Sequence, residues 1–227
     1  MGFWQELFPE PPLCINCGDT FVFSSLPRLC NSCLSEIELR EEPFVREIEG
    51  SDSFFTLINS PLVYRGAVRS LLRSLKYDNS PEAALPLAEI MVGSSMLAKL
   101  LAGSSALVVP VPLASSRLKS RGYNQAALLA GIIASKFSLE LDRNILKRPR
   151  ETPPLYELSS LERKNVLSGA FSVDNSLSWK LAGREVLLVD DIITTGSTLR
   201  EAGSLLAQKG AGNLLALTAA AVGKQDY

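Results

Sequence analysis

Histidine is absent from this 227-residue sequence, and its absence excludes the Ser-His-Asp and Cys-His arrangements used by many hydrolases. Any general acid, general base or metal ligand must therefore be Asp, Glu, Cys, Lys or Tyr. Long apolar runs are absent too, since none approaches the roughly 18 residues that a membrane-spanning helix needs. The first residues, MGFWQELFPEPP, lack the basic and apolar regions of a signal peptide. We therefore expect a cytoplasmic protein that does not insert into a membrane.

Net charge is nearly absent as well, at −1, but the charges are distributed unevenly along the chain. Residues 1–60 carry three basic and ten acidic side chains, residues 61–164 carry fifteen and eight, and residues 165–227 carry five and six. The middle of the chain is therefore the part that attracts anions. An apolar fraction of 46% is enough for the core of one α/β domain with a small additional module.

Cysteine is scarce, and all four cysteines fall in one short segment as two Cys-x2-Cys pairs: Cys14 with Cys17, and Cys30 with Cys33. Four thiolates at this spacing suit the tetrahedral coordination of Zn²⁺. Two disulfides or four unrelated buried thiols are the alternatives, and the missing signal peptide favours zinc. A site with four thiolates leaves no open coordination position, so we expect the Zn²⁺ to be structural.

This zinc ribbon and an acidic linker are predicted to occupy residues 1–52, and a second domain residues 53–227. Only Arg28, Arg40 and Arg46 are basic in the first part, so we do not expect the ribbon to bind nucleic acid by itself. The second domain begins with one or two strands over residues 53–64. The next segment, 66–77, predicts an amphipathic helix. Its apolar face carries Val68, Leu71, Leu72 and Leu75, and a basic stripe carries Arg65, Arg69, Arg73 and Lys76.

From residue 106 onward, short apolar runs alternate with helical patterns, which is typical of parallel strands joined by crossover helices. We expect strands over residues 106–113, 185–191 and 213–222, and helices over residues 81–101, 122–136 and 197–209. The segment 144–173 is charged, contains prolines and has little periodicity, so we interpret it as a mobile lid. The predicted fold class is α/β, with a parallel sheet flanked by helices.

The segment 186–200, VLLVDDIITTGSTLR, is the strongest candidate for a functional site. An apolar strand ends in Asp190 and Asp191, and a loop rich in Thr, Ser and Gly leads into a helix. The first turn of that helix and the loop hydroxyls suit a phosphate group, while the two carboxylates suit vicinal ribose hydroxyls. A simple N-cap and turn would explain only one or two of these residues.

The same segment resembles the phosphoribosyl-diphosphate (PRPP) loop of type I phosphoribosyltransferases. The cysteine ribbon and the motifs LKYD, VVPVPL, RGYNQ, LKRPRETP, ERKNV and GAF occur in the order seen in the ComF/GntX family, so the resemblance covers nearly the whole chain. It implies a type I phosphoribosyltransferase-like fold, an N-terminal zinc ribbon and a link to DNA uptake in naturally competent bacteria.

The resemblance also implies roles for individual residues. Asp190 and Asp191 would bind the ribose hydroxyls, directly or through Mg²⁺. The remaining assignments are Thr194, Thr195, Gly196, Ser197 and Thr198 for the 5′-phosphate; Arg117, Lys119 and Arg121 for the pyrophosphate-binding loop; and Arg148, Arg150, Arg163 or Lys164 for neutralising the pyrophosphate that leaves. Catalysis of this kind is mainly electrostatic, because the ribose becomes cation-like as pyrophosphate departs.

The motif RGYNQ, residues 121–125, has two interpretations. It is either the start of a helix or a functional cluster, in which Tyr123 stacks on a base and Asn124 or Gln125 binds phosphate or acceptor. The sequence departs from the family pattern at two positions. Leu155 occupies a lid position where the family usually has glutamine, and Asn79 replaces the glycine that usually follows the LKYD motif.

Two functions are consistent with these features. The first is an enzyme that transfers ribose 5-phosphate from PRPP to a nitrogenous acceptor. The second is a non-catalytic protein that senses PRPP or a nucleotide, or binds single-stranded DNA, and assists DNA uptake together with other uptake proteins. The basic segments 65–76, 117–121 and 143–150 favour the second function, because they are able to follow a phosphate backbone.

Overall fold

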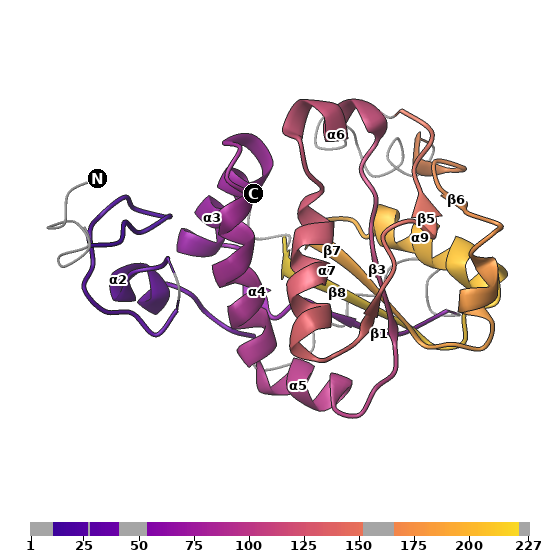
Figure 1. Cartoon of the computed structure of the whole chain (residues 1–227), viewed down its shortest axis with the longest axis horizontal. Helices are drawn as coiled ribbons and strands as arrows, with labels where there is room; N and C mark the ends of the chain where they lie inside the picture. Colours follow the sequence, from indigo (N-terminus) through magenta and orange to yellow (C-terminus); the bar gives the residue numbers. More distant parts are fainter. Residues whose placement is uncertain (1–10, 27, 41–53, 152–165, 223–227) are drawn as a thin grey trace, which may run out of the picture.

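A six-stranded sheet with parallel pairings forms the centre of the molecule (Figure 1). The structure, a computed structural model, describes residues 11–26, 28–40, 54–151 and 166–222. Five strands follow the order β1-β8-β7-β3-β4, and a short sixth strand, β2, pairs with the end of β8. The strands are β1 (Phe55–Asn59), β2 (Leu62–Val63), β3 (Leu107–Pro110), β4 (Glu140–Leu141), β7 (Val186–Ile193) and β8 (Leu214–Ala221). The predicted parallel α/β class is confirmed.

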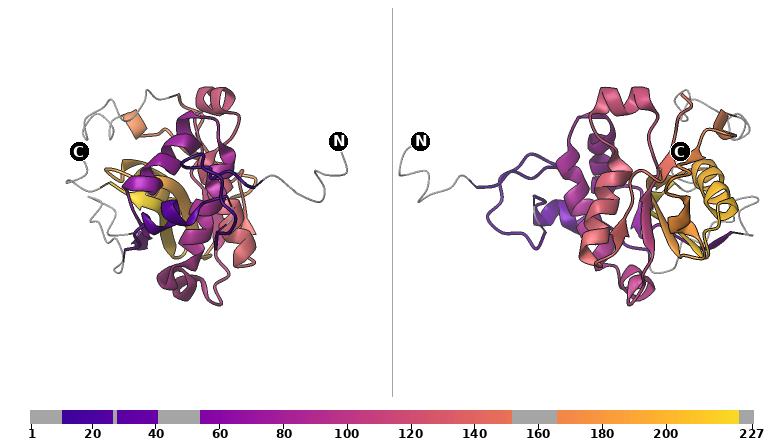
Figure 2. Two further views of the ribbon diagram at one scale, coloured as in Figure 1. Left: turned by 90° about the vertical axis from the view of Figure 1, so that its left-hand side faces the viewer. Right: turned by 45° about the vertical axis from the view of Figure 1, so that its right-hand side comes forward.

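Helices cover both faces of the sheet. Its inner strands carry runs of consecutive apolar residues, and successive side chains point to opposite faces, so both faces are apolar. On one face, Leu187 of β7 belongs to a cluster with α3 (Gly66–Tyr77), α4 (Ala84–Gly93) and α7 (Gln125–Lys136). On the other face, Leu188 packs with α9 (Ser197–Gln208). The two views in Figure 2 show α9 on the opposite side of the sheet from the other three helices.

Several expected elements differ from the structure in where they end. The segment 81–101 is not one helix but a short 3-10 turn, η1 (Pro81–Ala83), followed by α4 and α5 (Ser95–Leu101). The break lies at Ser94, whose side chain accepts a hydrogen bond from the Leu97 N–H and so starts a new helix. The helix expected from residue 122 begins only at Gln125, because Gly122 has φ 80° and ends the preceding helix α6 (Ser115–Arg121).

The arms of the predicted lid form a small antiparallel ribbon of β5 (Leu146–Lys147) and β6 (Ser172–Val173). Residues 152–165, which include Leu155, Arg163 and Lys164, lie outside the described part of the chain. A 3-10 turn, η3 (Ser178–Leu181), leads from β6 toward β7. Residues 148–151 follow β5 directly.

The cysteine-rich segment lies outside α3 and contains one short helix, α2 (Asn31–Ser35) (Figure 1). Leu29 and three of the cysteines are buried in the same apolar cluster as the inner face of α3. The chain then pairs with the edge of the sheet, since Arg40 N–H donates to Pro61 O and Val63 N–H to Glu38 O. The predicted boundary at residue 52 falls in residues 41–53, which the structure does not describe, and it stays a prediction.

In the described part of the chain, no helix has both the length and the apolar character needed to cross a membrane.

Candidate functional site

Two carboxylates lie near the carboxyl end of β7, an inner strand of the sheet. Asp191 is buried and Asp190 is partly exposed, and the backbone N–H of Asp191 donates to Asp190 Oδ1 at 2.8 Å. Burial, together with the negative charge of Asp191, raises the pKa of Asp190 to about 8.

The hydroxyl-rich loop follows directly and leads into α9. Gly196 has φ 77°, a left-handed conformation that favours glycine, and Ser197 is the first residue of the helix. Thr195 Oγ1 and Ser197 Oγ lie 2.9 Å apart, so these hydroxyls converge at the helix N-terminus. Backbone N–H groups of the first turn of a helix and its dipole attract anions. The loop thus has the donors that a phosphate requires.

A cavity of about 550 Å³ opens in front of the carboxylates, and its size lies in the range of small-molecule sites. Predicted site residues that line it are Arg117, Arg121, Gln125, Arg148, Asp190, Asp191, Thr194 and Thr198. Thr195, Gly196 and Ser197 line a smaller hollow of about 30 Å³, which shares Thr194 and Thr198 with the larger one. The structure therefore brings most of the predicted residues to one place.

Lys76 is a site residue that the sequence analysis assigned to the wrong surface. Its Nζ lies 3.1 Å from Asp191 Oδ2, its side chain is only 20% exposed, and it lines the large cavity. It is therefore not part of the solvated basic stripe, which retains Arg65, Arg69 and Arg73. The motif LKYD, residues 75–78, was the signal in the sequence that could have pointed to this role, because it contains Lys76 and forms the end of α3.

Arg148 is the best placed of the predicted lid cations. It is 7% exposed, lines the cavity, and lies with its guanidinium 5.3 Å from the ring centre of Phe171. Burial lowers the pKa of Arg148, and the nearby charge of Arg117 acts in the same direction. Arg150 does not line the cavity, and its guanidinium donates to Ser168 O at 3.1 Å. The ribbon of β5 and β6 thus supplies one cation to the site from its described residues.

The turn after β3 leads into α6, which carries the other cations. Arg117 and Arg121 line the cavity, whereas Lys119 is exposed and does not. The Glu151 carboxylate accepts a hydrogen bond from the Ser116 N–H at 2.8 Å, and the Ser116 hydroxyl also donates to it. This contact ties the start of α6 to the arm of the lid that carries Arg148.

The side chains of the motif RGYNQ fall into two groups: two make structural contacts, and two line the cavity. Asn124 is the N-cap of α7, accepting from the Ala126 N–H, and its amide donates to Val111 O at 2.9 Å. The Tyr123 hydroxyl donates to Leu75 O at 2.9 Å, and burial raises the pKa of Tyr123. Neither side chain lines the cavity, so the helix-start interpretation accounts for both. Arg121 and Gln125 do line it, and Arg121 donates to the Gln125 amide oxygen.

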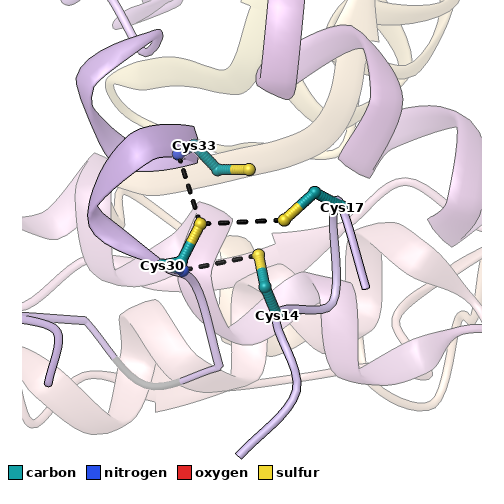
Figure 3. Close-up of side chains that lie close together, drawn as sticks. All are labelled: Cys14, Cys17, Cys30 and Cys33. Carbon is teal, nitrogen blue, oxygen red and sulfur yellow. Dashed lines mark hydrogen bonds between the residues drawn. The ribbon is translucent and has the colours of Figure 1, made fainter. Parts of the chain in front are cut away.

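The four cysteines form a second candidate site, well separated from the cavity. Their sulfur atoms all lie within 4.8 Å of one another, and the side chains of both Cys-x2-Cys pairs point to a common centre (Figure 3). Burial opposes ionisation of Cys14, but backbone hydrogen bonds, first from Cys30, hold its pKa at about 6. Thiolates in this arrangement are the ligands of a closed tetrahedral Zn²⁺ site. The predicted clustering is confirmed, and the residues fit a structural metal.

Comparison with known proteins identifies the family to which the chain belongs. Residues 123–225 match the phosphoribosyl transferase domain. The "DNA utilization protein YhgH" of Salmonella typhimurium is 31% identical over 201 residues, which cover 88% of this chain and 79% of that protein. "Competence protein F" of Haemophilus influenzae is 42% identical over 103 residues, 45% of this chain and 44% of that protein. The chain belongs to the ComF family.

Membership of the ComF family confirms the resemblance inferred from the motifs. A solved structure, a hypoxanthine phosphoribosyltransferase from Staphylococcus aureus, is similar at a TM-score of 0.38 and 15% identity, over 62% of this chain and 62% of that chain. One departure from the ComF pattern also has a structural account. Asn79 has φ 52°, and asparagine is among the few residues other than glycine that tolerate this conformation. The other departure, Leu155, lies outside the described residues.

Proposed function

We propose that this ComF-family protein is a phosphoribosyltransferase, which moves ribose 5-phosphate from PRPP to a nitrogenous acceptor and releases pyrophosphate. The observation that carries the proposal is that three groups line one cavity and the hollow beside it: the carboxylates Asp190 and Asp191, the hydroxyl loop, and four cations. The cations come from α3, from α6, which supplies two, and from the residue after β5. PRPP has one matching part for each group. These parts are vicinal hydroxyls, a 5′-phosphate and a pyrophosphate.

Each group would act in a different part of the reaction. The loop 194–198 would hold the 5′-phosphate and so fix the position of the ribose. Arg117, Arg121 and Arg148 would stabilise the negative charge that develops on pyrophosphate as the bond to the anomeric carbon breaks. The remaining assignments to Lys119, Tyr123, Asn124, Arg150, Arg163 and Lys164 stay predictions, as does closure of the lid. Cations that are already in place before the bond breaks, as proposed for those around the pyrophosphate, lower the activation barrier of the transfer because they need not rearrange.

The acidic pair also fits Mg²⁺, which prefers oxygen ligands. Asp191 Oδ2 is buried and faces Lys76 Nζ at 3.1 Å, and no hydrogen bond from the described residues satisfies it. It would therefore be able to ligate a cation, or accept from a ribose hydroxyl, beside Lys76. Bound Mg²⁺ would neutralise charge on the pyrophosphate. Asp190, with its raised pKa, would release a proton when it becomes a ligand.

An acceptor screen tests the transferase directly. The protein is incubated with PRPP, Mg²⁺ and a panel of bases and amines, and released pyrophosphate is measured. We expect release that depends on one class of acceptor and that falls strongly in Arg148→Gln. A matched control is Arg143→Gln, because Arg143 is exposed and does not line the cavity. Release that no acceptor increases would contradict the transferase and leave a PRPP-binding protein.

A second function, in which the protein binds single-stranded DNA as an accessory of DNA uptake, is favoured by a specific surface. Arg69 and Arg73 are exposed on α3, one turn apart, in a row that suits phosphates along a strand. Two relatives carry the names "DNA utilization protein" and "Competence protein". This surface is distinct from the cavity, so the two functions are compatible.

Salt-dependent binding of an oligonucleotide tests this second function. Replacing both Arg69 and Arg73 by glutamine should lower the slope of log affinity against log salt by about 1.4, because each phosphate contact on a single strand contributes about 0.7. The control is Lys99→Gln with Lys209→Gln, which removes the same charge from two other exposed positions, one in α5 and one directly after α9. Equal slopes in the two double variants would exclude α3 as the DNA-binding surface.

A further inference from the structure

The last turn of α3 presents two consecutive side chains to the cavity. Lys76 reaches inward to Asp191, and Tyr77, the final residue of the helix, also lines the cavity. Consecutive Cα atoms are about 3.8 Å apart. Both side chains line the cavity that Asp190 and Asp191 also line.

Tyr77 differs from the other residues of the site in its chemistry. It is the sole aromatic residue among the described residues that line the cavity, and it is 61% exposed. An aromatic ring left open to solvent at the wall of a cavity offers a flat apolar face to a ligand. The surrounding wall is partly apolar, through Val111, Pro112 and Leu113, and carries the amide groups of Asn79 and Gln125. Such a mixture of apolar surface and a few amides suits a flat polar ring.

The backbone that carries Tyr77 is held on both sides. The Tyr123 hydroxyl donates to Leu75 O at 2.9 Å, which ties the last turn of α3 to the start of α7. After the helix, Asn79 turns the chain with φ 52°, and the Asp78 N–H donates to Ser74 O. A stacking ring is effective when its position is fixed before the ligand binds. The hydrogen bond of Tyr123 also holds the backbone that carries Tyr77.

We propose that Tyr77 forms the stacking wall of the acceptor subsite, and that the acceptor is a planar nitrogen heterocycle of the nucleobase class. This inference rests on the proposed transferase function and names its substrate class. In the transfer, a ring nitrogen forms the new bond to the anomeric carbon, and the bond from that carbon to the pyrophosphate oxygen breaks with its electron pair leaving on pyrophosphate. The proton of the ring N–H passes to water. An aliphatic amine would gain nothing from the Tyr77 ring.

The test compares a nucleoside 5′-monophosphate with ribose 5-phosphate, which carries a hydroxyl group at the anomeric carbon in place of the base. Dissociation constants of both, and of PRPP with Mg²⁺, are measured by titration calorimetry. The wild-type protein should bind the nucleotide more tightly, and Tyr77→Ala should reduce that advantage about tenfold, the usual scale of stacking on one aromatic side chain. Tyr77→Phe should keep the advantage, and PRPP affinity should stay unchanged in both variants.

Trp179→Ala is the matched control, because Trp179 is 71% exposed and does not line the cavity. A nucleotide advantage that survives in Tyr77→Ala, or is lost in Trp179→Ala to the same extent, overturns the inference. So does a wild-type protein that binds PRPP but gains nothing from the base. Failure of the transferase proposal has a different signature: the acceptor screen would show no acceptor-dependent release of pyrophosphate, whatever Tyr77 does to nucleotide binding.

Discussion

Lys76 belongs to the basic stripe by helical periodicity and to the binding site by its place in the fold. The pattern of residues 65–76 puts it on the same face as Arg65 and Arg69, and nothing in that pattern separates them. The separation arises because the last turn of α3 lies beside the carboxyl end of β7, where Asp191 is buried. Asp190 and Asp191 were predictable because their motif is continuous in sequence. Their counter-ion was not, since it comes from a residue more than one hundred positions away.

The ion pair makes a prediction about stability. Lys76→Met leaves Asp191 buried without its cation, so the free energy of unfolding of the ligand-free protein should fall by about 2 kcal/mol, less than for a fully buried pair because Lys76 is partly exposed. Urea unfolding at neutral pH measures this. Arg73→Met, an exposed position one turn earlier on the helix, should change it by less than about 0.5 kcal/mol. Equal losses in the two variants would contradict the role of the ion pair.

At the scale of elements, the ribbon of β5 and β6 is held by a charged contact. Lys147 Nζ donates to Asp174 Oδ2 at 2.6 Å, and this hydrogen bond, with those from Ser176, lowers the pKa of Asp174 to about 2. Because the folded-state pKa is depressed, the contribution to stability is present above about pH 4 and is lost as the pH falls toward 2. Carboxyl NMR titration measures the value. In Lys147→Ala the pKa of Asp174 should rise toward its usual range, and an unchanged pKa would show that Lys147 does not cause the shift.

The cysteine ribbon makes a second prediction at this scale. The protein should contain one Zn²⁺ per chain, and Cys30→Ser with Cys33→Ser should remove it, because two thiolates no longer form a closed site. Zinc content and amide hydrogen exchange are the measurements. Faster exchange should appear in residues 12–37 and in α3, whose apolar face shares a cluster with the cysteines. Retained zinc would contradict the assignment, and exchange limited to the ribbon would support the boundary predicted at residue 52.

The element boundaries that sequence patterns missed have local causes. The pattern over residues 81–101 is mostly apolar and has no clear break. The helix boundary at Ser94 depends on its capping hydrogen bond, which the sequence pattern does not reveal. Gly122 was predicted to begin a helix, and its positive φ instead ends one. By contrast, the bounds predicted for α3 are those observed, since an amphipathic pattern with two distinct faces specifies its own ends better than an apolar one.

For the whole molecule, the sequence predicted the class of the fold but not the order of its strands. Alternation of apolar runs and helical patterns specifies parallel strands, and the observed sheet has them. The position of β8 between β1 and β7 follows from pairings that no local pattern encodes, because every residue of β8 is apolar or small. Most of the predicted site residues nevertheless line one cavity around Asp190, which lies near the carboxyl end of β7, where ligands of parallel sheets bind.

The central claim is that Asp190 and Asp191 bind the ribose of PRPP, with Mg²⁺, in front of β7. Its most direct test is calorimetric titration of PRPP with Mg²⁺ into the wild-type protein and into the variant with Asp190→Asn and Asp191→Asn. These substitutions keep the size of the side chains and remove the charges that ligate a cation. We predict that Mg²⁺-dependent PRPP binding is abolished while the zinc content of the ribbon is unchanged. PRPP affinity equal to that of the wild-type protein would contradict the account.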